Sequence, residues 1–306
     1  MLVLLIAARC GGAMTVTASA RLRTLLASEK LSLMPCCFDG LTARLVEDAA
    51  FNVTFMSGFG VSASRGYPDV QLTSYGEMLN SAQTIVAALR RGTPCIADGD
   101  TGYGNALNVK RTVRGYAQVG CAGVMIEDQV SPKRCGHTRV KGVVEFDEAV
   151  TRIRAACDAR DEFFKVTGSK PVVVARTDAN SVAGLDEALR RCAAFREVGA
   201  DVTFMEAPKT VDEMRRYCAT VDGPKLANML EGGATPILPP SELEDMGYTL
   251  AAYPLTLLSA SVNAMAAALA DLRGGETPPN LTPFPDLCEA VGFDEYWQED
   301  DRYLFK

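Results

Sequence analysis

The chain has 306 residues, of which 48% are apolar and 23% are charged, and its formal net charge is −7. This composition is typical of a globular enzyme, and its lysines and arginines form no basic stripe, which argues against nucleic-acid binding. The ten cysteines follow no metal-finger spacing, and most lie in apolar runs, so we expect a reducing intracellular compartment.

The first 28 residues read as an N-terminal extension, 1–28, because they contain no acidic residue. The apolar run 2–8 is too short to span a bilayer, and Arg9 follows it, whereas a signal peptide carries its positive charge first. We therefore expect no membrane association. A cytoplasmic location and import into a mitochondrion or plastid both stay open, as does a start at Met14.

Short apolar runs alternate with helix-period stretches along most of the chain. The expected strands are Ser32–Cys37, Val53–Met56, Pro94–Ala97, Gly123–Ile126, Val172–Ala175, Val202–Met205, Lys225–Asn228 and Leu250–Tyr253. The expected helices are Thr42–Ala50, Ser74–Arg90, Asn108–Val119, Glu145–Ala159, Leu185–Val198, Val211–Ala219 and Ser241–Met246. This alternation over residues 29–272 predicts one parallel (β/α)8 TIM barrel. An open doubly wound sheet is the alternative, but no Gly-x-Gly-x-x-Gly follows the first strand.

Residues 273–306 form a C-terminal arm of different composition. Proline is frequent after Gly274, and the end of the chain is aromatic and acidic, with Trp297, Tyr303 and Phe305. We expect this arm to pack on a partner subunit rather than to form a domain of its own.

Acidic side chains follow several of the expected strands. They are Asp98, Asp100, Glu127, Asp178 and Glu206, with Asn228 and Glu231 after the seventh strand. In a barrel these positions meet at one rim, and oxygen ligands suit Mg²⁺ or Mn²⁺ better than zinc. A single Asp after a strand is more often a helix N-cap, and Asp100 is partly a turn former. Five converging acids nevertheless favour a metal site.

Arg176 closes an apolar strand and would emerge from it into the same rim. A substrate carboxylate held by two hydrogen bonds is one natural partner for its guanidinium. A structural ion pair with Asp178 or Glu206 is the other, and the spacing alone favours neither.

Glu127 opens into a polar loop that carries Lys133, Arg134, Cys135 and the only histidine, His137. Neighbouring cations lower the pKa of a thiol and make it a usable acid, base or nucleophile. A loop cysteine beside cations is more often inert than catalytic. Here, however, the loop starts at a candidate metal ligand and can fold over the metal.

Seven ordered segments resemble the isocitrate lyase/phosphoenolpyruvate mutase superfamily over residues 31–265. They are Gly40–Arg44, Ser57–Ala63, Asp98–Asn105, Ile126–Gln129, Lys133–His137, Ala175–Ala179 and Asn228–Pro236. The resemblance implies a (β/α)8 barrel whose C-terminal helix is swapped between subunits, in a homotetramer built as a dimer of dimers. It also implies an Mg²⁺ ion, with Mn²⁺ as a substitute, and a small dicarboxylate substrate.

Site residues are implied by position in those segments. Asp98 and Glu127 would hold the metal, with Asp69 and Asp100 in its outer shell. The residues implied to bind substrate are Ser57, Gly58, Phe59, Arg176, Glu206 and Asn228. Those implied to act in catalysis are Lys133, Cys135, His137 and Arg176.

The loop Lys133–His137 distinguishes the branches of this superfamily. The lyases and hydrolases of carbon–carbon bonds carry Lys-Arg/Lys-Cys-Gly-His, as here, whereas the phosphonate-forming mutases resemble Lys-Thr-Asn-Ser. The resemblance therefore implies an Mg²⁺-dependent lyase or hydrolase of 2-hydroxy or 2-oxo dicarboxylates, such as a 2-alkylmalate or oxaloacetate. The reaction would pass through an enolate that Cys135 protonates.

Methylisocitrate lyase is the first alternative, and a phosphoenolpyruvate or carboxyphosphonoenolpyruvate phosphonomutase is a weaker one. Methylisocitrate lyases usually show tyrosine where this chain has Phe55, and an arginine near the end of the barrel where it has Ser259. Without that arginine, a third carboxylate of the substrate would have no cationic partner. Asn228–Gly233 and Tyr253–Thr256 instead resemble the petal-death-protein-like members, which include 2-alkylmalate lyases and oxaloacetate hydrolases. A non-catalytic barrel that binds a dicarboxylate is the alternative from another class.

Overall fold

Eight parallel strands form the centre of the molecule, for which the computed structural model describes residues 16–135 and 141–304. The strands are β1 (Ser32–Cys37), β2 (Thr54–Met56), β3 (Cys95–Asp98), β4 (Gly123–Glu127), β5 (Val172–Thr177), β6 (Val202–Met205), β7 (Leu226–Asn228) and β8 (Leu250–Tyr253). Their hydrogen-bonded order is β6-β5-β4-β3-β2-β1-β8-β7. A parallel bridge between Thr203 and Lys225 joins β6 to β7 and closes the barrel. The predicted TIM barrel is confirmed, and the open sheet is excluded.

All eight predicted strands are present, but some extend into polar residues. Asp98 pairs with Met125, and Glu127 pairs with Arg176, so these side chains belong to the ends of strands and not to the loops after them. The apolar runs in the sequence end before the strands do, because an apolar run indicates only where side chains are buried. A strand continues as long as its backbone groups form hydrogen bonds with a neighbouring strand.

The seven predicted helices are also present. They are α2 (Gly40–Asp48), α4 (Tyr75–Ala88), α5 (Ala106–Gln118), α6 (Phe146–Thr167), α8 (Leu185–Glu197), α9 (Val211–Thr220) and α10 (Pro240–Met246). Helix α6 continues beyond its predicted end at Ala159 and stops at Gly168, whose φ of 73° provides a left-handed cap. No helix in the described ranges is long and apolar enough to cross a membrane.

Two short helices, α3 (Gly58–Ser64) and α7 (Ala179–Val182), follow β2 and β5 at the rim, and a third, α1 (Ala18–Ala27), precedes β1. Helix α1 lies within the segment that the sequence set apart as an extension. Its Leu22 and Leu26 are buried in the same apolar cluster as the barrel's inward-facing side chains. The guanidinium of Arg23 donates to the carbonyl of Pro171 and to Asp201, which ties α1 to the start of β5. This part of the N-terminal segment therefore helps to form the barrel's core.

Alternate residues of the strands face inward and fill the barrel. The upper layer of this interior, toward the carboxyl ends of the strands, consists of Cys36, Phe55, Met125, Phe204, Leu226 and Ala252. Two other apolar clusters lie between the strands and the surrounding helices. The interior is therefore apolar up to the level at which the acids begin.

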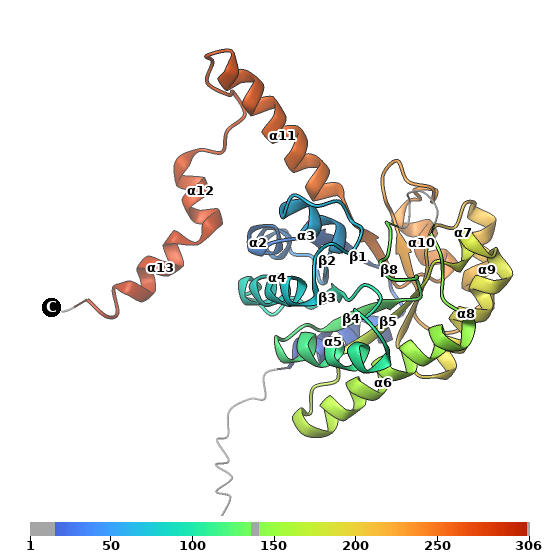
Figure 1. Ribbon diagram of the computed structural model, residues 1–306. Coiled ribbons are helices and arrows are strands. Elements are labelled where there is room, and N and C mark those ends of the chain that lie inside the picture. Colours follow the sequence, from blue (N-terminus) through green and yellow to red (C-terminus); the bar gives the residue numbers. More distant parts are fainter. Residues whose placement is uncertain (1–15, 136–140, 305–306) are drawn as a thin grey trace, which may run out of the picture.

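The C-terminal helices α11 (Thr256–Arg273), α12 (Phe284–Val291) and α13 (Phe293–Asp300) lead away from the barrel (Figure 1). Helix α11 has no buried residue. The arm returns to its own chain at α2 and α4, where Arg44 donates to the carbonyl of Ala290 and Arg90 pairs with Glu295. Much of the apolar surface of the arm is exposed within the single chain.

Candidate active site

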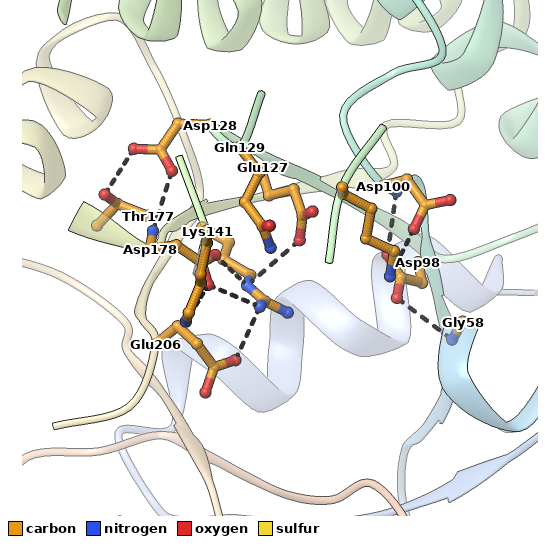
Figure 2. A network of polar contacts seen from close by, with 12 residues as sticks. Gly58, Asp98, Asp100, Glu127, Asp128, Gln129, Lys141, Thr177, Asp178 and Glu206 are labelled. Atoms are coloured by element: carbon orange, nitrogen blue, oxygen red, sulfur yellow. Dashed lines mark hydrogen bonds and ion pairs between the residues drawn. The ribbon is translucent and has the colours of Figure 1, made fainter. Parts of the chain in front are cut away.

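Charged side chains from neighbouring strands meet at the carboxyl-terminal rim, in two groups (Figure 2). Asp98 and Asp100 lie beside Gly58 in one group, and Glu127, Asp178 and Glu206 form the other. All five acids are at most 5% exposed. The sequence-based expectation that acids after the strands converge is met, apart from Glu231, which is exposed and accepts a hydrogen bond from the hydroxyl of Thr256.

Asp98 is held from two sides by backbone amides. Its Oδ2 accepts a hydrogen bond from the amide of Gly58 at 3.2 Å, and its Oδ1 accepts one from the amide of Asp100 at 3.0 Å. A Cβ at Gly58 would lie 2.5 Å from Oδ2, so only glycine permits this approach. Ser57 caps α3 by accepting the amide hydrogen bond of Gly60. The predicted substrate-binding segment therefore also positions the carboxylate of Asp98.

Lys133 brings its ammonium group into the first group of acids. Its Nζ lies 2.7 Å from Oδ1 of Asp69 and 2.8 Å from Oδ1 of Asp100, and the side chain is 4% exposed. Burial raises the pKa of Asp100 to about 6, against the opposing effect of Lys133. Burial would lower the pKa of Lys133, but the neighbouring carboxylates, Asp100 above all, outweigh it and raise that pKa. Lys133 is therefore a protonated, buried cation at neutral pH.

Arg176 is at the centre of the second group. Its Nε and Nη2 donate to the two carboxylate oxygens of Asp178, at 2.8 and 3.1 Å. The guanidinium also lies 3.3 Å from Glu127 and 3.2 Å from Glu206. Both ion pairs considered from the sequence are thus present. The same side chain lines the cavity described below, so the two predicted functions of Arg176 are compatible.

Residues that the sequence analysis missed contact Asp178, the partner of Arg176, and hold it in place. Lys141 places its Nζ 2.7 Å from Oδ1 of Asp178. Asp128 accepts hydrogen bonds from the amide of Asp178 and the hydroxyl of Thr177, and it pairs with Arg191. Burial opposes ionisation of Asp178, but Arg176 and Lys141 hold its pKa below the usual value. Asp128 follows Glu127 directly, yet nothing in its spacing indicates a partner on α8.

A cavity that is open to solvent extends from the rim toward the barrel interior. Its charged and polar lining residues are Ser57, Asp69, Asp98, Lys133, Cys135, Arg176, Glu206 and Asn228. Its apolar lining residues include Cys36, Phe55, Phe59, Phe204, Leu226, Leu230, Pro254 and Leu255. Most of the predicted substrate-binding and catalytic residues therefore surround one space. Asn228 donates from Nδ2 to Glu206 at 3.2 Å.

The loop after β4 is pinned at its base. Gln129 and Val143 form an antiparallel bridge, and the side chain of Gln129 accepts a hydrogen bond from the amide of Arg134. Cys135, at the end of the described part of this loop, is half-buried and reaches the cavity. The predicted catalytic His137 lies outside the described residues.

The four predicted metal residues divide between the two groups. Both carboxylate oxygens of Glu127 are buried and have no hydrogen-bond partner within the described ranges, and the same is true of Oδ1 of Asp100, which has only its ion pair. Burial raises the pKa of Glu127 well above its usual value. No three potential ligands are gathered into a metal cluster among the described residues. Buried carboxylate oxygens that accept no hydrogen bond nevertheless suit Mg²⁺, which binds few protein ligands and keeps several waters.

A parallel barrel that collects buried acids and cations around a cavity at its carboxyl-terminal rim is an enzyme of the TIM-barrel class. The chain belongs to the phosphoenolpyruvate phosphomutase family, whose model matches residues 22–273, and thereby to the PEP mutase/isocitrate lyase superfamily. It is therefore an enzyme of a superfamily whose members include lyases, mutases and hydrolases. The alternative of a non-catalytic barrel is excluded.

Three relatives illustrate the similarity. The chain is 39% identical over 290 residues to 2,3-dimethylmalate lyase of Eubacterium barkeri, with 93% of this chain and 98% of the relative covered. It is 40% identical over 252 residues to a probable 2-methylisocitrate lyase of Corynebacterium glutamicum, covering 82% and 79%. A structure of oxaloacetate acetylhydrolase with the inhibitor 3,3-difluorooxalacetate superposes with a TM-score of 0.87 at 34% identity, covering 94% and 97%.

A further similar structure contains a metal. Phosphonopyruvate hydrolase in complex with oxalate and Mg²⁺ superposes with a TM-score of 0.83 at 28% identity, covering 94% of this chain and all of the other. A dianionic ligand and Mg²⁺ are thus accommodated together in a related barrel.

Proposed function

We propose that this protein is an Mg²⁺-dependent lyase or hydrolase that cleaves a carbon–carbon bond in a small 2-hydroxy or 2-oxo dicarboxylate, such as a 2-alkylmalate or oxaloacetate. The observation that carries the proposal is the shared cavity, where Lys133 and Cys135 of one loop line the same space as Asp98 and Arg176. The relatives named for 2,3-dimethylmalate and oxaloacetate support this substrate class.

Asp98 and Glu127 would hold the metal, with Asp69 and Asp100 around its waters. The buried oxygens of Glu127 support this assignment, because within the described ranges they accept no hydrogen bond and their only close cation is Arg176, 3.3 Å from Oε2. When bound, Mg²⁺ would draw electron density from the oxygens of an α-oxycarboxylate and orient it.

The residues of the chain divide the remaining tasks. Arg176, already charged and fixed by Asp178, would bind a substrate carboxylate with the part of its guanidinium that faces the cavity. The 2-hydroxyl loses its proton to a base, the C2–C3 bond breaks, and its electron pair remains on the C3 fragment as an enolate. Cys135 would donate the thiol proton to that carbon. For oxaloacetate, water adds first, so that the products are oxalate and acetate.

The composition of the cavity favours a dicarboxylate over a tricarboxylate. Within the described lining, Lys133 and Arg176 are the cations, and Lys133 is already paired with two acids. The side chains of Phe55, Leu226 and Leu230 offer an apolar contact for an alkyl substituent. A third carboxylate would enter this lining without a cation, so methylisocitrate is the second candidate, supported by the relatives that carry its name.

We further propose that copies of the chain exchange α11 in a homotetramer built as a dimer of dimers. In a (β/α)8 barrel the eighth helix packs beside β8 and β1, but here α11 leads away. A groove over these strands is lined by Leu33, Pro35, Leu45, Val46, Ala49, Phe51, Tyr253, Thr256 and Leu257. Helix α11 exposes a matching stripe of Val262, Met265, Leu269 and Leu272. The helix of a second copy would fill the groove.

The test of the proposed activity is an NMR assay of the purified protein with Mg²⁺, with an EDTA control. Separate samples contain oxaloacetate, 2-methylmalate, 2,3-dimethylmalate, methylisocitrate and phosphonopyruvate. Formation of oxalate and acetate, or of pyruvate from a malate, is the expected result. Phosphoenolpyruvate formed from phosphonopyruvate would show a mutase instead, and succinate formed from methylisocitrate would show the second candidate.

A further inference from the structure

Gln71 lies in the loop between α3 and α4, two residues beyond Asp69, and its backbone is in an unusual conformation. Its φ is 60°, in the left-handed region that residues other than glycine rarely adopt. Such a conformation persists where the surroundings fix it, and it is enriched at functional sites. A glycine would adopt it without strain, so the contacts of the side chain must account for the glutamine.

The amide of Gln71 connects three loops of the rim. Its Nε2 donates to Oγ1 of Thr101 at 3.0 Å, in the loop after β3. Its Oε1 accepts two hydrogen bonds from the loop after β4, from the hydroxyl of Ser131 and the amide of Lys133, both at 2.9 Å. One side chain therefore uses both ends of its amide to join the segments that carry Asp69, Asp100 and Lys133.

Two of these attachment points are firmly fixed. Thr101 is fully buried and adjoins Asp100. In the loop that carries Gln71, the hydroxyl of Thr73 is hydrogen-bonded to the hydroxyl of Ser62 at 3.2 Å. Both residues are almost fully buried, and Ser62 belongs to α3, so this bond anchors the loop to that helix. The Ser131–Lys133 segment is thus fastened to rigid parts of the rim.

We propose that Gln71 is a positioning residue, which holds the backbone at Lys133 so that the ammonium group reaches Asp69 and Asp100 and Cys135 faces the cavity. This inference rests on the proposed function insofar as Lys133 and Cys135 take part in the reaction. Gln129 cannot replace this link, since it belongs to the same loop as its partner Arg134 and shapes the loop without attaching it to the neighbouring one.

Two substitutions at Gln71 separate its side chain from its backbone strain. Gln71→Ala removes the hydrogen bonds and keeps an unfavourable φ, whereas Gln71→Gly removes both. Ala50→Gly is the matched control, because Ala50 also has a φ of 60° but is exposed after α2, away from the site. Thermal denaturation confirms that each variant is folded.

The first readout is hydrogen exchange of the peptide that contains the Lys133 amide, which needs no substrate. Both Gln71 variants should speed exchange there about ten-fold, as expected for the loss of one or two hydrogen bonds, and Ala50→Gly should leave it unchanged. Ser131→Ala should speed it less, and should add nothing in the Gln71→Ala background. Unchanged exchange in folded Gln71→Ala overturns the inference, whatever the activity.

The second readout is kcat/KM with the substrate that the NMR assay identifies. It should fall about ten-fold in both Gln71 variants and stay at the wild-type value in Ala50→Gly. If exchange increases but kcat/KM does not fall, the link exists and its role in the reaction is wrong. A wild-type protein that turns over none of the five substrates would contradict the proposed function, while the exchange experiment would still decide whether Gln71 holds the loop.

Discussion

Arg176 and Asp178 form a two-bond ion pair that is buried from solvent, with the carboxylate of Asp178 itself fully buried. The pair fixes the plane of the guanidinium beside the cavity. Asp178 is fixed in turn by its ion pair with Lys141 and by the hydrogen bond that its backbone amide donates to Asp128. In the proposed function, the guanidinium that would bind a substrate carboxylate is thereby oriented before the substrate arrives, which would reduce the cost of binding.

Asp178→Ala should destabilise the protein by about 3 kcal/mol, because it leaves Arg176 and Lys141 buried without their shared partner. Urea denaturation measures the free energy of unfolding. Asp186→Ala is the control, since Asp186 pairs with Arg216 at the exposed surface, and removal of such a pair should cost at most about 0.5 kcal/mol. Equal effects of the two substitutions would contradict this account of the buried pair.

Cys135→Ser should lower the rate of product formation about 100-fold or more, because a hydroxyl is a much weaker acid than a thiol. NMR of the reaction measures the rate, and thermal denaturation should show little change. Cys288→Ser, in the C-terminal arm, should retain full activity. An unimpaired Cys135→Ser enzyme would remove the thiol from the mechanism.

Glu127→Gln should abolish the heat of Mg²⁺ binding in titration calorimetry, a measurement that requires no turnover. The amide cannot supply the negative charge that the metal prefers. Glu231→Gln is a suitable control, because Glu231 also follows a strand but is exposed and bonded to Thr256. Retained Mg²⁺ affinity in Glu127→Gln would exclude Glu127 as a ligand.

Glu47 should make stability depend on pH in the acid range. Burial opposes its ionisation, but hydrogen bonds from the amides of Arg91 and Thr93 prevail and lower its pKa below 4.5. The folded state thus binds the proton more weakly than the unfolded state, and this contribution to stability is lost as pH falls below about 4.5. Urea denaturation at several pH values should show a shallower acid loss for Glu47→Gln than for wild type or exposed Glu289→Gln. Parallel curves would contradict this assignment.

The exchange of α11 can be tested by the mass in solution. Met265→Glu with Leu269→Glu would place two charges in the apolar groove of the second copy, so the tetramer should dissociate. Size-exclusion chromatography with light scattering measures the mass. Val166→Glu changes an apolar residue on α6 that is even more exposed, and it should leave the mass unchanged. A wild-type monomer would contradict the proposed assembly.

Much of the fold was predictable because the strands are buried on both faces and therefore appear as continuous apolar runs. Glycines such as Gly120 and Gly199, which both have positive φ, end helices before those strands and mark the alternation. The same reasoning identified Asp98, Glu127 and Arg176. A charged residue that directly follows a buried strand lies at the carboxyl end of that strand, which is the rim of the barrel. Helix α1 was not predicted, because no local pattern in its residues indicates that Leu22 and Leu26 meet the barrel.

The sequence by itself determined the barrel, the rim acids and the loop with Lys133 and Cys135, since each depends on residues close together along the chain. Only the tertiary structure decided which of these groups are paired. Lys133 reaches Asp69 across the rim, Asp128 meets Arg191 on α8, and Gln71 joins loops that are about 30 and 60 residues away. These contacts depend on the closure of the barrel, which brings strand ends together regardless of their separation in sequence, and no local pattern specifies them.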